Sequence, residues 1–270
     1  MEIMTLSFVD EQTLDVISIY DRGLAYGDGC FTTALILDGE VVMLEQHLAR
    51  LTQQSQRLGL PDINTDSIAE KMCHISKGVN KGVVKVIVTC GSGGRGYSRL
   101  GANQAQVIIS RHDYPKFYDQ WQKHGITVGI SEQQLGINPM LAGLKHLNRL
   151  EQVLLRNELD QRSEDDLLVT DINGNIIECC SANIFWLKNA QWHTPSLASA
   201  GVSGIMRARI MNLNLDILVG DYRLTDIDNI DAMFISNAIL GIVPVKIFNL
   251  KVLDISLVED IQKQCLTFDS

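Results

Sequence analysis

The chain of 270 residues carries a formal net charge of −9, and 46% of its residues are hydrophobic. Nucleic-acid binders normally present a basic face, because phosphates dominate their affinity, so this charge balance argues against a nucleic-acid partner. The length suits two domains of ordinary size, and the longest apolar stretch, 232–250, is interrupted by Asn237, Pro244 and Lys246, which predicts short strands rather than a membrane span.

The first half of the chain predicts a small α/β domain at 1–115. Asp38-Gly39 is a strong hairpin signal between two β-prone runs, and two segments with apolar residues at helical spacing follow. The expected elements are strands at 30–37 and 40–44, helices at 45–58 and 68–79, and strands at 83–90 and 105–110.

The second half predicts a larger domain at 126–270, after a polar and aromatic segment at 116–125 that we expect to link the two domains. Strands and helices are mixed here without a regular βαβ rhythm, which favours an α+β fold over a doubly wound parallel sheet. The expected elements are a strand at 126–131, a helix at 147–159, strands at 167–171 and 184–187, a helix from Gly204 and a strand at 232–236.

The six cysteines form no CxxC pair and no Cys/His cluster with zinc-ligand spacing. We therefore predict no metal site and free thiols in a reducing compartment. The N-terminal segment 1–12 is acidic and lacks the apolar core of a signal peptide, so the expected location is the cytoplasm.

The glycine-rich segment Gly91–Gly96 matches the pattern GxGxxG and follows a predicted strand. A dinucleotide-binding site also requires a helix directly afterwards, but the next residues show no helical period, so a nucleotide-dependent oxidoreductase is rejected. One interpretation is a flexible connection between strands. The other is a ligand-binding loop, in which glycines let the backbone approach the ligand and Arg95 recognises a carboxylate.

Two charged residues lie in unusual surroundings. Lys145 lies between a glycine-containing loop and a predicted helix, and it is either an ordinary solvated lysine or an amine with a lowered pKa that can form a Schiff base. Glu178 is flanked by apolar and small residues, so it either faces outward or meets a cation or a protonated ring nitrogen.

The loop Gly201–Arg207 opens a helix and predicts an anion site or a plain N-cap at Ser203.

Taken together and in this order, these segments resemble the class IV aminotransferase family, the fold-type IV pyridoxal-phosphate enzymes. The resemblance extends from about Asp21 to Pro244 and implies a fold like that of the D-amino-acid aminotransferases, with a small α/β N-terminal domain and a larger C-terminal domain with a barrel-like sheet. The most specific stretches are Tyr26–Ala34, Gly91–Tyr97, Asn138–Leu154, Glu178–Trp186 and Gly201–Arg207.

The resemblance assigns roles to individual residues. Lys145 would hold pyridoxal 5'-phosphate covalently and later move a proton, and Glu178 would face the pyridine nitrogen of this cofactor. Thr32 or Thr33 would take part in catalysis. The cofactor phosphate would be bound by Arg50, Gly204, Ile205, Ser236 and Asn237. The substrate would be contacted by Tyr26, Arg95 and Tyr97.

Within the family, the segments are most similar to those of the bacterial aminodeoxychorismate lyases of folate biosynthesis. The implied reaction removes the enolpyruvyl group of 4-amino-4-deoxychorismate as pyruvate and leaves 4-aminobenzoate. Close relatives often have Arg-Gly where this chain has Cys90-Gly91, so Arg95 would carry more of the carboxylate recognition.

Two alternatives remain. One is an aminotransferase for D- or branched-chain amino acids, which would keep the same cofactor and lysine. The other is a non-catalytic ligand-binding relative, which would be expected to lose Lys145 or Glu178, although both are present. The family also implies a homodimer in which each site borrows residues across the interface, with Arg95 or its neighbours as candidates.

Overall fold

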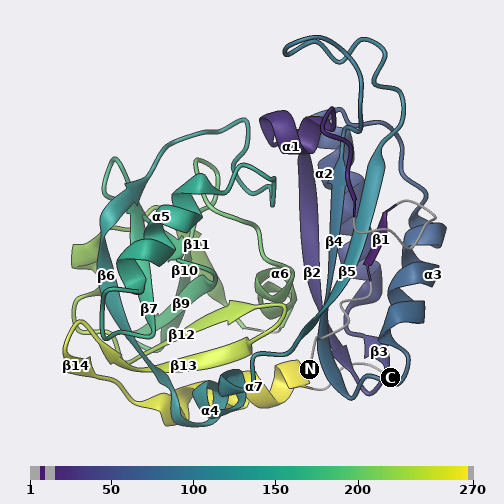
Figure 1. Ribbon diagram of the computed structural model, residues 1–270. Coiled ribbons are helices and arrows are strands. Elements are labelled where there is room, and N and C mark those ends of the chain that lie inside the picture. The colour runs from purple at the N-terminus through teal and green to yellow at the C-terminus, as the bar shows by residue number, and fades with distance from the viewer. Residues whose placement is uncertain (1–6, 10–15, 214, 267–270) are drawn as a thin grey trace. The chain divides into compact units, whose positions relative to one another are not determined.

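The computed structural model describes residues 7–9, 16–213 and 215–266 (Figure 1). The chain divides into two compact units, of which the first comprises Met1–Tyr114 with Lys145–Asn148 and the second Pro115–Leu144 with Arg149–Ser270. Each unit has its own sheet and its own apolar core.

The first unit is built on an antiparallel sheet of five strands in the order β1-β5-β4-β2-β3. Its core lies between this sheet and two helices, and it includes Cys30 and Ala34 from one face of β2 and Leu51 and Met72 from the helices. The elements are β1 (Ser7–Val9), α1 (Arg22–Tyr26), β2 (Gly29–Leu37), β3 (Glu40–Val41), α2 (Leu44–Leu58), α3 (Thr65–Ser76), β4 (Lys81–Thr89) and β5 (Gln106–Asp113).

The predicted hairpin is confirmed: Asp38 and Gly39 both have positive φ angles, 50° and 87°, between the paired strands β2 and β3. The second predicted strand is shorter than 40–44, because helix α2 already begins at Leu44. Gly59, with a φ of 64°, ends α2 as expected.

The second unit contains a mixed sheet of nine strands among the described residues, in the order β11-β10-β9-β12-β13-β6-β7-β8 with β14 beside β13. Figure 1 shows the strands of this sheet curling. The strands are β6 (Ile126–Leu135), β7 (Asp166–Asp171), β8 (Ile176–Cys179), β9 (Asn183–Lys188), β10 (Gln191–Pro195), β11 (Ile217–Gly220), β12 (Ala232–Asn237), β13 (Gly241–Phe248) and β14 (Lys251–Val252). The helices are α4 (Phe117–His124), α5 (Leu150–Leu159), α6 (Ile205–Met211) and α7 (Glu259–Leu266), with short 3-10 turns at Leu224–Ile227 and Ile255–Val258.

Two segments differ from the sequence-based expectation. Residues 116–125, expected to form an interdomain linker, contain helix α4 of the second unit, because Tyr118 and Trp121 pack against the core of that unit. The helix expected at 147–159 begins only at Leu150, because the preceding residues bond to the edge of β2 instead: Lys145 O accepts from Phe31 N (2.9 Å), and Leu147 N donates to Gly29 O (3.0 Å).

Candidate active site

Lys145 belongs to the short segment that extends the first unit's sheet. An isolated bridge between Cys30 and His146 places Lys145 opposite Phe31, and directly opposed residues of paired strands project to the same face. The amine Nζ of Lys145 accordingly lies 4.6 Å from the centre of the Phe31 ring. A cation this close to an aromatic face is held by the ring quadrupole, so β2 positions the amine as well as the backbone of Lys145.

A second lysine, which the sequence did not single out, lies over the same ring. Lys85 on β4 is opposite Thr33 of β2, and its Nζ lies 5.1 Å from the centre of the Phe31 ring. Its only sequence signal is a charge inside an otherwise apolar run. Phe31, Thr33 and Lys85 therefore share one face of the sheet with the amine of Lys145, and two cations on one face suit an anionic ligand.

The two candidate threonines lie on opposite faces of β2. Thr32 is 0% exposed, and its Oγ1 lies 2.6 Å from Nδ1 of His47 on helix α2. Thr33 is partly exposed on the face that carries Phe31. Because side chains alternate along a strand, Thr32 is buried against α2, whereas Thr33 lies on the same face as Lys145.

Helix α2 contributes a buried histidine, His47, and a partly buried arginine, Arg50, three residues apart, so that they lie on neighbouring positions of one helix face. Burial lowers the pKa of Arg50 to about 10, although a charge on Cys30 would oppose the shift. Burial, followed by the cations Arg50 and Lys145, lowers the pKa of His47 to about 3. His47 is therefore a neutral imidazole, and its Nε2 has no hydrogen-bond partner among the described residues.

In the second unit, Glu178 on β8 is 6% exposed, and its Oε2 accepts from the backbone N–H of Val202 (2.9 Å). Burial lowers the pKa of Arg149, and the negative charge of Glu178 opposes this shift, so the carboxylate is buried within reach of a cation. The interpretation of Glu178 as an outward-facing strand residue is therefore wrong.

The loop before α6 is held by Asn183 of β9. Its Oδ1 accepts from Gly204 N (3.1 Å), and its Nδ2 donates to Val202 O (2.8 Å). A Cβ atom at Gly204 would lie 2.1 Å from Asn183 Oδ1, so a side chain there would displace the Asn183 amide from its hydrogen bond to Gly204 N. The buried Ile205 opens α6 directly after Gly204, and no side-chain hydrogen bond caps that helix.

Ser236 and Asn237, at the end of β12, differ in what their side chains do. Ser236 is 0% exposed, and within the described part of the chain its Oγ has no hydrogen-bond partner. Asn237 Nδ2 instead donates to Ser181 O (3.1 Å), while its Oδ1 accepts from the N–H groups of Ile239 (2.8 Å) and Leu240 (2.9 Å). The asparagine side chain thus stabilises the turn after β12, whereas the serine hydroxyl stays unsatisfied among the described residues.

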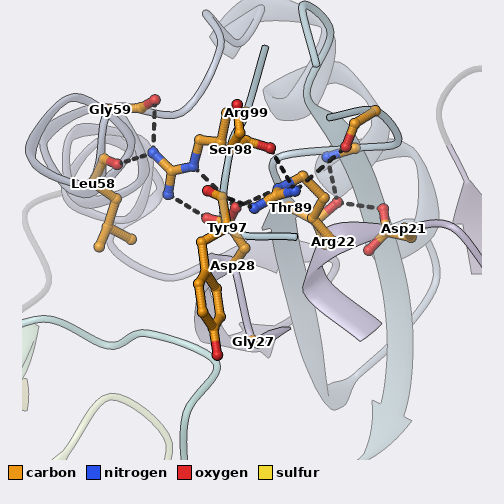
Figure 2. Close-up of polar contacts among 12 residues, drawn as sticks. Asp21, Arg22, Gly27, Asp28, Leu58, Gly59, Thr89, Tyr97, Ser98 and Arg99 are labelled. Atoms are coloured by element: carbon orange, nitrogen blue, oxygen red, sulfur yellow. Dashed lines mark hydrogen bonds and ion pairs between the residues drawn. The ribbon is translucent and has the colours of Figure 1, made fainter. Parts of the chain in front are cut away.

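The candidate substrate-contacting side chains of the first unit are solvent-exposed. Arg95 is exposed, Tyr97 is 91% exposed, and the rings of Tyr26 and Tyr97 lie 5.7 Å apart. The backbone carbonyl of Tyr97 accepts a hydrogen bond from Nη2 of the buried Arg22, as Figure 2 shows. The sequence did not single out Arg22, because its backbone partners in 93–98 lie more than 70 residues away along the chain.

No cluster of three or more His, Cys, Asp or Glu side chains suited to a metal occurs within 7–9, 16–213 and 215–266. Within the same ranges, no helix has the length and apolar character needed to cross a membrane.

Residues 29–248 match the family model described as amino-transferase class IV. The chain belongs to this family. It is 33% identical over 233 residues to the aminodeoxychorismate lyase of Vibrio harveyi, a match that covers 85% of this chain and 86% of the relative. The predicted family membership is confirmed.

Solved structures agree with this assignment. The crystal structure of 4-amino-4-deoxychorismate lyase from Pseudomonas aeruginosa matches with a TM-score of 0.89 and 32% identity, covering 96% of this chain and 97% of the other. A hypothetical aminotransferase from Mycobacterium tuberculosis in its PLP-bound form matches with a TM-score of 0.83 and 15% identity, covering 99% and 100%, which shows a shared fold. The predicted two-domain α+β class of this family is confirmed.

Proposed function

We propose that this chain is a pyridoxal-phosphate-dependent lyase that converts 4-amino-4-deoxychorismate to 4-aminobenzoate and pyruvate. The observation that carries this proposal is the similarity to two lyases of that name, at about one-third identity and over nearly the full length of each chain. Lys145 and Glu178 are both present, and both are ordered by contacts within their own units.

The residues fit the cofactor. Ser236 offers a buried hydroxyl without a partner in the described residues, and Gly204 adds no side chain beside the start of α6, which no side-chain hydrogen bond caps; both features suit the close approach of a phosphate. By the family resemblance, Arg50 would bind that phosphate and Lys145 would bind the aldehyde. The same resemblance assigns further phosphate contacts to Gly204, Ile205 and Ser236, with Asn237 shaping the turn next to Ser236.

When bound, pyridoxal phosphate supplies an electron-poor ring that stabilises negative charge on the substrate carbon next to nitrogen. Glu178 would keep the ring nitrogen protonated and so strengthen this effect. Nζ of Lys145, once displaced by the substrate amine, would remove the proton from the ring carbon that bears nitrogen. The C–O bond to the enolpyruvyl group then breaks, and the substrate ring becomes aromatic.

Protonation of the methylene carbon of the departing group completes pyruvate. Of the two candidate threonines, Thr33 shares the face of the Lys145 amine, whereas the Thr32 hydroxyl already contacts His47. We therefore assign proton delivery to Thr33 and a supporting role to Thr32. The two carboxylates of the substrate would meet Lys85 on that face and Arg95, with Tyr26 and Tyr97 beside them.

The test is direct. Purified wild-type protein is expected to absorb visible light through its cofactor, to lose that absorption on hydride reduction and to release equal amounts of 4-aminobenzoate and pyruvate. Lys145→Ala is expected to abolish release and to change the spectrum, whereas Lys123→Ala, at an exposed position of α4, leaves both unchanged. A colourless protein that takes up no pyridoxal phosphate would refute the proposal.

Amino transfer is the second candidate, because the matching family model takes its name from aminotransferases. The same preparation should be offered D- and branched-chain amino acids with a 2-oxo acid. Amino transfer without 4-aminobenzoate release would overturn the lyase assignment and leave the cofactor assignment intact.

We also infer a homodimer in the cytoplasm. The family resemblance supports the dimer, and the six free cysteines support a reducing compartment. The proposed partners are a small-molecule substrate and a second copy of the chain.

A further inference from the structure

Arg22, on the short helix α1, is a buried cation surrounded by backbone carbonyl groups. Its side chain is 4% exposed. Figure 2 shows the guanidinium within a network that joins α1 to the loop after β4. Its contacts are from Nη1 to the carbonyls of Gly93 (3.3 Å), Gly96 (3.0 Å) and Ser98 (3.1 Å), from Nη2 to that of Tyr97 (3.3 Å) and from Nε to Asp28 Oδ2 (2.8 Å).

The loop 93–98 needs such an anchor. Gly93, Gly94 and Gly96 have φ angles of 139°, 73° and 56°, a conformation that side-chain-bearing residues rarely adopt. Glycine-rich backbone loses much conformational entropy when it is fixed, so a single defined loop structure requires compensating contacts. Four carbonyl groups that converge on one planar guanidinium provide them.

A second arginine braces the C-terminal end of the loop. Arg99 donates through Nε to Asp28 Oδ2 (3.0 Å) and makes a short contact from Nη2 to Asp28 Oδ1. It also donates to the carbonyls of Leu58 (2.6 Å) and Gly59 (3.1 Å) at the end of α2. Asp28 therefore joins both arginines directly before β2 begins, and the loop is tied to the helix and strand that carry the candidate site.

Arg22 is not placed to receive a substrate, because its side chain is 4% exposed and all three of its nitrogens already donate to acceptors of the chain. Its effect is exerted through its neighbours. Tyr97 has an anchored carbonyl and an exposed ring, and that ring lies beside Tyr26, whose own ring centre is 4.9 Å from the Arg22 guanidinium. Arg95 lies between the anchored residues.

We propose that Arg22 is a positioning residue that fixes the backbone of loop 93–98, so that Arg95 and Tyr97 present one geometry to a carboxylate of the substrate. This inference rests on the proposed function, since it assumes that the loop contacts the substrate. It predicts that substrate affinity depends on Arg22, whereas the bond-breaking step does not, because Arg22 touches neither the reacting atoms nor Lys145.

The kinetic test compares Arg22→Met with Arg156→Met, which makes the same chemical change at an exposed ion pair of α5. For Arg22→Met we expect KM to rise about tenfold or more, with kcat within about threefold of wild type and the cofactor spectrum unchanged. Arg22→Lys keeps the charge but lacks the planar fork, so it should recover part of the affinity. It also serves if Arg22→Met does not fold. An unchanged KM in both variants, or equal losses of kcat and of folded protein, would overturn the proposal.

Hydrogen exchange provides a measurement that needs no substrate. In Arg22→Met, amides of 91–101 are expected to exchange about tenfold faster, while those of β2 and β4 keep their protection. Unchanged exchange in the loop, or acceleration throughout the first unit, would count against a positioning role. Wild-type protein that releases no 4-aminobenzoate would instead refute the proposed function, and the anchoring role would then stand or fall on the exchange of the loop alone.

Discussion

Ser236 and Asn237 show how adjacent residues can have opposite parts in a site. Both are polar and both end the same strand, yet only the asparagine satisfies its hydrogen bonds within the described chain. A buried hydroxyl without a partner carries a desolvation cost that a ligand can relieve. Removing an unsatisfied hydroxyl should therefore leave the free energy of unfolding unchanged or raise it, whereas removing a hydrogen-bonded group should lower it.

Ser236→Ala is expected to leave the free energy of unfolding without cofactor unchanged or slightly higher, because it removes an unsatisfied polar group, and to weaken pyridoxal-phosphate binding about tenfold. The control, Thr194→Val, removes a buried hydroxyl that donates to Ile184 O (2.9 Å). It should lower stability by about 1 kcal/mol and leave cofactor affinity unaltered. Denaturation without cofactor and a spectroscopic titration measure both. Similar losses of stability in the two variants would contradict the assignment of Ser236.

Lys85 can be tested in the same way against a lysine of the same strand. Lys81 lies over the ring of Tyr114 at 4.0 Å, as Lys85 lies over Phe31 at 5.1 Å. Lys85→Met should raise KM about tenfold and leave the cofactor spectrum unchanged, because it removes a carboxylate partner and not a cofactor contact. Lys81→Met should leave KM unchanged. Equal effects of the two substitutions would remove Lys85 from the site.

At the scale of elements, the periodicities of β2 and α2 determine on which face each candidate residue lies. The twofold alternation of β2 places Thr32 against α2 and Thr33 on the opposite face. Helical spacing on α2 places His47 and Arg50 on one side. The alternation is visible in the sequence, but which face meets the helix depends on how the two elements pack.

This packing predicts a pH dependence. The pKa of His47 falls to about 3 in the folded chain, below the ordinary 6.5, mainly through burial. Below pH 6.5 the unfolded chain binds a proton that the folded chain does not, so stability falls as the pH decreases from 6.5 towards 3, by at most ~1.4 kcal/mol per pH unit.

His47→Gln should reduce this loss of stability with falling pH, independently of its effect on the stability at pH 7. His74→Gln, at an exposed position of α3, should leave the loss unchanged. Urea denaturation between pH 4 and 7 gives both slopes. Identical slopes in wild type and His47→Gln would show that another group causes the acid loss.

At the scale of the whole molecule, the chain crosses between its two units more than once. Lys145–Asn148 belong to the first unit, although the residues on both sides belong to the second. The lysine is thus positioned by β2, more than 100 residues earlier in the sequence. This crossing explains why the predicted helix at 147–159 was too long at its start.

The proposed homodimer belongs to this scale. Helix α5 exposes Leu150, Val153 and Leu154, which lie three and four residues apart on one helical face. We expect light scattering to give twice the chain mass of 30.0 kDa. Leu154→Glu should lower that mass, and Gln161→Glu, at an exposed position beyond α5, should not. A mass of one chain for the wild type would contradict the dimer.

Local sequence signals were sufficient for the Asp38-Gly39 hairpin, the core of α2, the α+β class and the family, because turn chemistry, apolar spacing and short motifs are properties of neighbouring residues. They could not separate Thr32 from Thr33 or find Lys85 and Arg22. Those distinctions arise from strand register, burial and hydrogen bonds between residues far apart in the chain, which exist only once the sheet and its loops have assembled.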